Sequence, residues 1–242
     1  MKEVIKSRSN ARVKEWLKLR NGKDPALYLI EGEIMVSYAL ELGVVETLIT
    51  TNLDTPFNLA NEVIYISKDV ASKLSSYVTS QNVFVTIKKE SKPLDTTKPL
   101  IYLDDIKDPS NLGAIMRSAL AFDFGGVIAS RRSVNFYNDK VISTAKGAHF
   151  ILPIANMNED ELIEFCKKNT YKLTTTRLEK AQKSTNFTFL RKTMLVVGNE
   201  ARGVSSSIHK HADAIIYIPI KHIDSLNVAI AASILMEKIA NQ

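Results

Sequence analysis

The sequence predicts an α/β protein built in two successive parts. Short apolar runs typical of strands alternate with longer runs typical of helices along most of the chain. Residues 90–99 interrupt this alternation, because they are polar, contain two prolines and have no periodicity. We therefore expect a linker at residues 90–99, with domains at residues 1–89 and 100–242, and a chain of 242 residues is long enough for two domains.

The first part is expected to begin with a basic helix and to continue as a small α/β unit. In residues 9–22, Val13, Trp16 and Leu17 share one helical face and basic side chains cover the rest. Strands are expected at residues 26–32, 45–51, 63–67 and 83–89. Helices are expected between them at residues 33–43 and 68–80.

The second part is expected to form a mostly parallel sheet. Its strands are expected at residues 100–106, 125–130, 150–156, 171–177, 193–199 and 214–220. They are strongly apolar and helices fall between most of them, which favours a sheet covered on both faces. A last apolar helix is expected at residues 226–240. Ligands of such sheets bind at the carboxyl ends of the strands.

The composition is that of a globular protein. Hydrophobic residues make up 45% of the chain, and no apolar run reaches the length of a membrane span. The first 16 residues lack the apolar core of a signal peptide. The single cysteine, Cys166, occupies an apolar position of an expected helix and is interpreted as a core residue. A cytoplasmic protein without an internal disulfide fits these observations.

The basic charge points to an anionic partner. The formal net charge is +6, and the first 22 residues hold only two acidic side chains. Their basic residues are Lys2, Lys6, Arg8, Arg12, Lys14, Lys18 and Arg20. This stretch fits a solvated basic face and a phosphate-binding surface for RNA or DNA equally well.

A second basic stretch, residues 129–140, combines arginines with aromatic residues. Arg131 and Arg132 precede Phe136 and Tyr137, which could stack on unpaired bases. A plain exposed loop explains this stretch equally well.

Polar residues that a plain fold does not require follow three of the expected strands. Asn111 and Arg117 lie in the helix after the first of these strands, and Glu200 lies in the glycine-bounded loop after the second. Ser225 and Asn227 stand at the start of the last helix, where serine is an ordinary cap but asparagine in the first turn is unfavourable. On that stretch alone, a cap with one tolerated asparagine is favoured over a ligand site.

Other chemistries lack their sequence patterns. The chain has no phosphate-binding loop of the Walker type and no G-x-G-x-x-G after a strand. Its histidines are not spaced with other ligands for a metal site, and His209 and His211 are expected on the surface. Asp104 and Asp105 end an expected strand, where adjacent side chains point to opposite faces, so no joint role is expected for them.

The three polar segments together resemble the three motifs of the SpoU, or TrmH-type, RNA ribose 2′-O-methyltransferases of the SPOUT superfamily. Residues 108–122, DPSNLGAIMRSALAF, resemble the first motif, and residues 196–204, VVGNEARGV, the second. Residues 218–232, IPIKHIDSLNVAIAA, resemble the third motif. Residues 7–22 and 27–43 are similar to the family's small substrate-binding domain.

The resemblance implies a catalytic domain with a deep trefoil knot. It implies S-adenosylmethionine as the methyl donor, bound at Gly198, Ile218 and Leu226. A glycine after a buried strand suits this role, because it permits close approach of the backbone. The resemblance also implies a homodimer that shares its RNA site between subunits. The histidine spacing leads us to expect no metal.

The resemblance places Arg117 at the reacting hydroxyl, with Asn111, Glu200, Ser225 and Asn227 around it. A guanidinium stays protonated and makes a poor base. We therefore expect Arg117 to stabilise the developing alkoxide and to grip a neighbouring phosphate through two hydrogen bonds. Glu200 is expected to hold that guanidinium or the donor.

The resemblance favours RNA as the partner of the basic stretches. The expected RNA contacts are Arg8, Arg12, Lys14, Lys18, Arg131 and Arg132. The small first domain makes ribosomal RNA the preferred substrate, with transfer RNA as the alternative.

One departure from the family keeps a second function open. Residues 220–224 contain no glycine and are about one residue shorter than the family's usual loop, which borders the donor pocket. A non-catalytic RNA-binding or ribosome-assembly factor is therefore an alternative. A nicotinamide-dependent enzyme is a weaker alternative, because its glycine fingerprint is missing.

Overall fold

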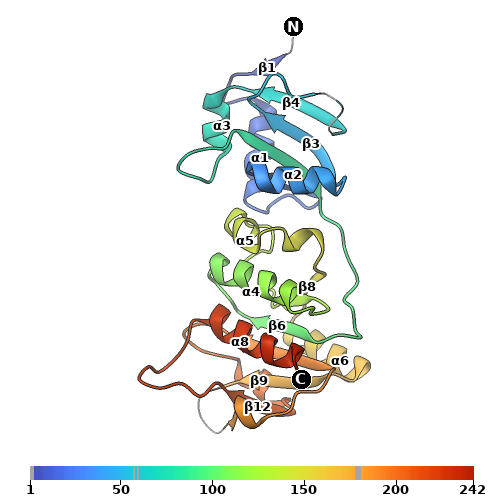
Figure 1. The fold of residues 1–242 in the computed structure, drawn as a ribbon, viewed down its shortest axis with the longest axis vertical. Helices are drawn as coiled ribbons and strands as arrows, with labels where there is room; N and C mark the ends of the chain where they lie inside the picture. Colours follow the sequence, from blue (N-terminus) through green and yellow to red (C-terminus); the bar gives the residue numbers. More distant parts are fainter. Residues whose placement is uncertain (1–2, 57, 59, 178–180) are drawn as a thin grey trace. The chain divides into compact units, whose positions relative to one another are not determined.

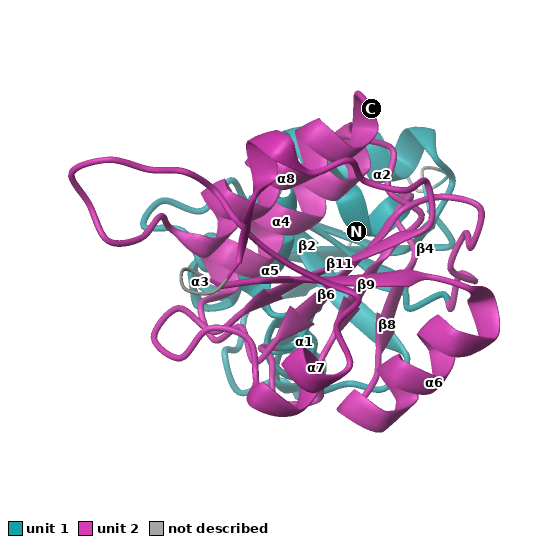
Figure 2. Cartoon of the chain, turned by 90° about the horizontal axis from the view of Figure 1, so that it is seen from below, with its two compact units in different colours: residues 1–90, 135–150 teal, residues 91–134, 151–242 magenta. Residues whose placement is uncertain are grey.

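The computed structural model describes residues 3–56, 58, 60–177 and 181–242. The chain divides into two compact units (Figure 2). Unit 1 comprises residues 1–90 and 135–150, and unit 2 comprises residues 91–134 and 151–242. Each unit has its own sheet (Figure 1).

Within the described residues, unit 1 has a five-stranded mixed sheet in the order β1-β4-β3-β5-β2. The strands are β1 (Val4–Ile5), β2 (Leu27–Glu31), β3 (Val45–Thr50), β4 (Glu62–Ile66) and β5 (Val83–Lys88). Strand β4 pairs in parallel with β1 and β3, whereas β5 pairs antiparallel with β2 and β3. The four strands expected in this part are therefore present.

Helices bury apolar side chains against this sheet. They are α1 (Ala11–Arg20), α2 (Glu33–Glu41), α3 (Lys68–Leu74) and α5 (Asp139–Ala145). Helix α1 begins after Asn10, whose side chain accepts a hydrogen bond from the Arg12 amide. Its buried residues Val13, Trp16 and Leu19 join one apolar cluster with α3, and most of its exposed positions are basic.

The units differ from the expected domains in two respects. Residues 91–99, expected to be part of a linker, belong to unit 2, where Leu94 packs against an apolar cluster. Residues 135–150, which belong by sequence to the second expected domain, pack in unit 1. Ile142 of α5 and Phe150, in a short 3-10 helix (Ala148–Phe150), are buried in a cluster with residues of β2, β3, β5 and α2. The apolar face of this segment is covered by elements far away in sequence, so the local pattern could not assign it.

Among the described residues, unit 2 contains a seven-stranded sheet in the order β10-β12-β9-β11-β6-β7-β8. Every strand pair found in it is parallel, which confirms the expectation of a mostly parallel sheet. The strands are β6 (Leu100–Asp104), β7 (Val127–Ala129), β8 (Ile154–Asn156), β9 (Lys172–Thr176), β10 (Gln182–Lys183), β11 (Thr193–Gly198) and β12 (Ala214–Tyr217).

The central strands β6 and β11 are buried along their whole length, because helices cover both faces of the sheet. Figure 2 shows α4 (Pro109–Ala121) and α8 (Val228–Ala240) on one side, and α6 (Glu159–Asn169) and α7 (Ser206–Lys210) on the other. A further 3-10 helix (Ser184–Asn186) follows β10. Cys166 of α6 is buried and unpaired, which confirms its interpretation as a core residue.

In the part of the chain that the structure describes, no helix has the length and apolarity to cross a membrane.

Candidate active site

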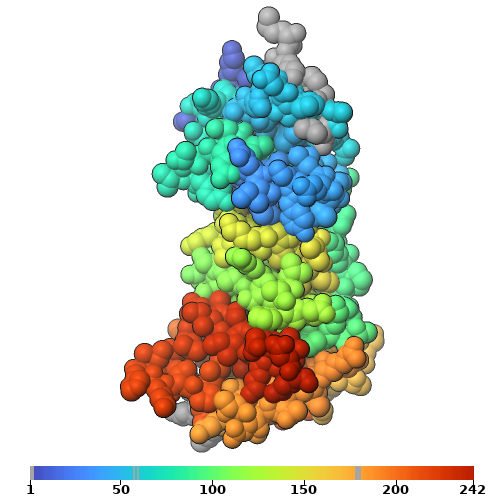
Figure 3. Space-filling model, in the orientation of Figure 1, coloured from blue at the N-terminus to red at the C-terminus, as the bar shows by residue number. Residues whose placement is uncertain are grey.

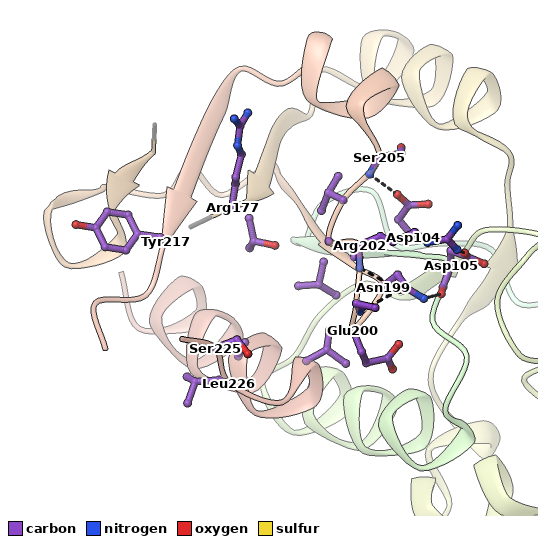
Figure 4. Close-up of a pocket in the computed structure, with 18 of the residues that line it drawn as sticks. Asp104, Asp105, Arg177, Asn199, Glu200, Arg202, Ser205, Tyr217, Ser225 and Leu226 are labelled. Atoms are coloured by element: carbon purple, nitrogen blue, oxygen red, sulfur yellow. Dashed lines mark hydrogen bonds and ion pairs between the residues drawn. The ribbon is translucent and has the colours of Figure 1, made fainter. Parts of the chain in front are cut away.

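The carboxyl ends of four neighbouring strands in unit 2 surround one large cavity (Figure 4). Gly198 at the end of β11 pairs directly with Asp104 at the end of β6, so the two central strands stop at the same level. The loops after β6, β9, β11 and β12 and the start of α8 line a cavity of about 1230 Å³. A volume of this size exceeds what a small organic ligand requires.

Six of the eight residues expected at the catalytic or donor site line this cavity: Gly198, Glu200, Ile218, Ser225, Leu226 and Asn227. Asn111 and Arg117 lie outside its lining. Arg132, expected to contact RNA, also lines it.

A chain of hydrogen bonds joins the three polar segments. The Asn111 side-chain amide donates to Oε1 of Glu200 at 2.7 Å. The Asn227 amide donates to Oδ1 of Asn111 at 2.9 Å. Asn111 is only 8% exposed, so its position is set by these contacts and by packing. Three segments separated by up to 116 residues therefore meet at one point.

Asn227 is the N-cap of α8, so its expected place inside the first turn is wrong. Its Oδ1 accepts hydrogen bonds from the amides of Ala229 and Ile230, at 2.9 and 3.3 Å. The helix begins at Val228, two residues later than expected, because this cap satisfies the free amides of its first turn. Ser225 is exposed and does not act as the cap.

Gly198 is required for close approach of the chain to itself. A Cβ atom there would stand 2.1 Å from the carbonyl carbon of Gly203 and 2.1 Å from the amide nitrogen of Val204. No side chain fits into that space. The loop after β11 therefore folds back against the strand end and forms one wall of the cavity.

The glycine-free loop between β12 and α8 reaches its bend at His222. This residue has a φ of +68°, in the left-handed region that glycine adopts most easily. Histidine is one of the few other residues that occupy this region with some frequency. Residues 221–225 are exposed, and the segment projects from unit 2 in the ribbon and in the space-filling view (Figure 3).

Arg117 is exposed on α4. Within the described ranges, its guanidinium makes no hydrogen bond or ion pair. The hydrogen bond of the Glu200 carboxylate goes to Asn111 instead of to Arg117. Among the described residues of one chain, the expected contact between Glu200 and Arg117 is therefore not formed.

Four of the six residues expected to contact RNA already form ion pairs on the surface. The pairs are Arg8–Asp69 at 2.6 Å, Arg12–Glu62 at 2.7 Å, Arg131–Glu161 at 2.7 Å and Arg132–Glu159 at 3.2 Å. Exposed pairs of this kind contribute about 0–1 kcal/mol, so a phosphate can compete for these arginines. Lys14 and Lys18 are exposed on α1.

Phe136 and Tyr137, for which base stacking and a plain exposed loop were equally favoured, are instead packed within unit 1. Phe136 is 3% exposed. The Tyr137 ring lies 4.9 Å from that of Tyr28, and Lys89 Nζ stands 4.4 Å from its centroid. Burial raises the pKa of Tyr137. Both aromatic residues are therefore part of the packing of unit 1.

Two cavity features were missed by the reading of the sequence. Asp104 and Asp105 are buried and both line the cavity. His209 is half-buried, so its expected surface position is wrong, and its Nδ1 lies 2.9 Å from Oγ1 of Thr175. Burial lowers the pKa of His209, and Arg177 lowers it further. The two aspartates could have been identified from the sequence, because they lie at the end of a strand, where ligands of parallel sheets bind.

Comparison with known protein families matches residues 98–237 to the SpoU rRNA Methylase family. The chain is 28% identical over 240 residues to the 23S rRNA (guanosine(2553)-2′-O)-methyltransferase RlmP of Bacillus subtilis. That alignment covers 96% of this chain and 97% of the relative. A longer relative, an uncharacterized tRNA/rRNA methyltransferase of Synechocystis, is 35% identical over 156 residues, which are 63% of this chain and 40% of that protein.

Solved structures show the same fold. An rRNA methyltransferase from Sinorhizobium meliloti superimposes with a TM-score of 0.88 at 25% identity, over 99% of this chain and 97% of that chain. An AdoMet-bound rRNA methyltransferase from Sinorhizobium meliloti superimposes with a TM-score of 0.87 at 24% identity, with the same coverage.

Proposed function

Because the chain belongs to the SpoU rRNA Methylase family, we propose that it methylates a ribose 2′-hydroxyl of ribosomal RNA with S-adenosylmethionine as the donor. The main structural support is the hydrogen-bonded chain Glu200–Asn111–Asn227, which joins the three matched segments beside the cavity. The relative that aligns with nearly the whole chain acts, by its name, on 23S rRNA. Ribosomal RNA is therefore preferred over transfer RNA.

The residues at the cavity fit the methyl donor. Ile218 and Leu226 are half-buried in its wall and offer apolar surface and loop backbone to an adenine ring. Gly198 keeps the strand end free of a side chain. The bound donor would supply a methyl group on a positively charged sulfur. Gly198, Ile218 and Leu226 would hold it beside Glu200.

Arg117 is proposed to act on the RNA. Its exposed guanidinium keeps its donors available for a phosphate and for the developing alkoxide. Asn111 and Asn227 would orient the Glu200 carboxylate, and Ser225 would contact the ribose from the start of α8. The ion-paired arginines and the lysines of α1 would hold the RNA backbone.

A homodimer would complete the site. Arg117 lies outside the cavity lining of its own chain, so it could serve the cavity of a second copy. Helix α8 leaves Ile230 and Ile234 exposed by 53% and 42%, on an apolar surface that a partner could cover.

The knotted topology of the family is proposed for unit 2. Strand β12 lies beyond β9, away from β11, yet the next element, α8, packs on α4 and β11. Residues 218–227 must therefore cross back over the strand ends, as a threaded segment would.

Calorimetric titration with S-adenosylhomocysteine, followed by methylation of unmodified ribosomal RNA, tests this function. We expect saturable binding and one methyl group on a ribose per RNA molecule. Absence of binding, alone and with ribosomal RNA present, would favour the non-catalytic assembly factor. Methylation of transfer RNA but not of ribosomal RNA would reassign the substrate.

A further inference from the structure

Two consecutive buried aspartates at the end of β6 are turned toward the same loop. Asp104 is 2% exposed and Asp105 is 5% exposed. In a regular strand their side chains would point to opposite faces. Asp105 instead has a φ of +61°, in the left-handed region, which turns the chain at this residue. The expectation of opposite orientations is therefore wrong.

Asp105 holds the first part of the loop after β11 through two contacts. Its carboxylate accepts a hydrogen bond from the guanidinium of Arg202, and its main-chain oxygen accepts one from the Asn199 amide at 2.9 Å. Asn199 in turn accepts hydrogen bonds at Oδ1 from the amides of Ala201 and Arg202, at 3.0 and 3.2 Å. Its main-chain oxygen accepts the amide of Gly203 at 2.8 Å. The loop is thus closed on itself and attached to β6.

Asp104 holds the other end of the same loop. Its Oδ2 accepts a hydrogen bond from the Ser205 amide at 2.7 Å, and Oδ1 lies 3.4 Å from the Arg132 guanidinium. Figure 4 shows both aspartates beside the loop, and along the chain Glu200 lies between the attached residues Asn199 and Ser205. Glu200 is exposed, so its main-chain position depends on these attachments.

We propose that Asp105 and Arg202, together with Asp104, are positioning residues that hold Glu200 in place for methyl transfer. This inference rests on the proposed function for its catalytic consequence. The contact joins the buried Asp105 carboxylate to the exposed guanidinium of Arg202 through a charge-assisted hydrogen bond. A misplacement of about 1 Å at a reacting group can lower turnover about 100-fold.

Asp105→Asn and Arg202→Gln test the pair from its two sides. Asparagine tolerates the left-handed conformation, removes the charge and replaces one accepting oxygen by a donating amide group. In each variant we expect kcat to fall at least tenfold, on the basis of such positioning effects. The Kd for S-adenosylhomocysteine should rise by a smaller factor than kcat falls, since the loop forms one wall of the cavity but the proposed donor contacts Gly198, Ile218 and Leu226 lie outside the held residues. The double variant should be no worse than either single variant, and Arg202→Lys should retain most of the turnover.

Lys107→Met is the matched control. Lys107 Nζ lies 2.7 Å from Oδ1 of the same Asp105 carboxylate, but its other contact is the main-chain oxygen of Arg132, outside the loop. This variant removes the positive charge of Lys107 from beside the Asp105 carboxylate and should keep the wild-type kcat. An equal loss of kcat in Lys107→Met would overturn the positioning role. A loss of kcat that is proportional to the fall in melting temperature across all variants would overturn it as well.

Hydrogen exchange measures the loop without any substrate. The amides of residues 201–203 should exchange at least tenfold faster in Asp105→Asn and Arg202→Gln than in wild type and in Lys107→Met. Unchanged exchange in both variants would overturn the proposed attachment. If the wild-type protein methylates no RNA, the proposed function fails, whereas this exchange experiment still decides whether the pair holds the loop.

Discussion

Asn227 performs two tasks with one side chain, because its oxygen caps α8 and its amide donates to Asn111. Substitution by aspartate separates the tasks, since a carboxylate accepts from the helix amides but cannot donate. We expect Asn227→Ala to lower the free energy of unfolding by about 1 kcal/mol and to lower methylation at least tenfold. Asn227→Asp should lower methylation to the same extent as Asn227→Ala, while its free energy of unfolding stays near the wild-type value.

Denaturant unfolding and methylation kinetics on the same preparations check this prediction. Full methylation activity in Asn227→Asp would show that the hydrogen bond to Asn111 has no catalytic role.

Arg117 is predicted to act through the fork of its guanidinium. Arg117→Lys keeps the charge but loses the bidentate geometry, so kcat should fall about 10- to 100-fold. Binding of S-adenosylhomocysteine should be unchanged, because Arg117 lies outside the cavity lining. Arg191→Lys, at another exposed arginine, is the control. Near-normal turnover of Arg117→Lys would refute the bidentate role.

His149 makes the stability of unit 1 depend on pH. Burial lowers its pKa to about 4, and Nε2 donates to the Phe136 oxygen at 2.8 Å. The unfolded chain, with a histidine pKa near 6.5, binds the proton more readily than the folded chain. The contribution of neutral His149 to the free energy of unfolding is therefore complete above about pH 6.5. As pH falls toward 4, this contribution is lost, which lowers the free energy of unfolding by about 1–3 kcal/mol.

Unfolding experiments between pH 7 and 4 measure this effect. His149→Gln should flatten the pH dependence, whereas His211→Gln, at an exposed histidine, should leave it unchanged. An identical pH profile for wild type and His149→Gln would rule out this group as the cause.

At the scale of elements, the end of β11 and the loop that follows it act as one unit. Gly198→Ala would place a methyl group 2.1 Å from backbone atoms of Gly203 and Val204, so the loop must move. We expect a loss of about 1–3 kcal/mol in unfolding free energy and much weaker binding of S-adenosylhomocysteine. Calorimetry and denaturant unfolding measure both quantities.

Gly203→Ala is the matched comparison for Gly198→Ala. A Cβ at Gly203 meets no atom within 4 Å, so this variant carries only the strain of a φ of +69°. The Gly203→Ala protein should bind S-adenosylhomocysteine more tightly than the Gly198→Ala protein. Equal binding by the two variants would mean that the close approach at the strand end does not shape the cavity.

At the scale of the whole molecule, the proposed site needs a second copy of the chain. We expect the wild-type protein to sediment as a dimer, and Ile234→Glu to shift it to monomers with little methylation activity. Ile151→Glu is the control, because Ile151 is 48% exposed and lies outside α8. A monomeric wild-type protein with full activity would contradict the proposed assembly.

Mixing two inactive proteins tests whether the site is shared. Arg117→Ala and Glu200→Ala chains that exchange partners would form mixed dimers with one intact site each. Such a mixture should regain about one quarter of the wild-type activity, from the random pairing of a symmetric dimer. A mixture that stays inactive after subunit exchange would place both residues in a site within one chain.

The sequence by itself determined the elements whose signal is local. The uninterrupted apolar runs of β6 and β11 predicted buried parallel strands, and the apolar position of Cys166 predicted its burial. The three polar segments after strands carried the resemblance to the family's three motifs. These features depend on neighbouring residues and on periodicity, which a sequence displays directly.

Only the tertiary structure decided which distant residues meet. It placed residues 135–150 in unit 1, where Phe136 is buried and the half-buried Tyr137 packs on Tyr28, although their aromatic character had suggested RNA contact. It also turned both aspartates of β6 toward one loop, through a backbone angle that no pattern of side chains announces. The hydrogen bonds between Asn111, Glu200 and Asn227 span 89 and 116 residues. Contacts over such separations depend on how whole sheets and helices pack, whereas local propensity acts over a few residues only.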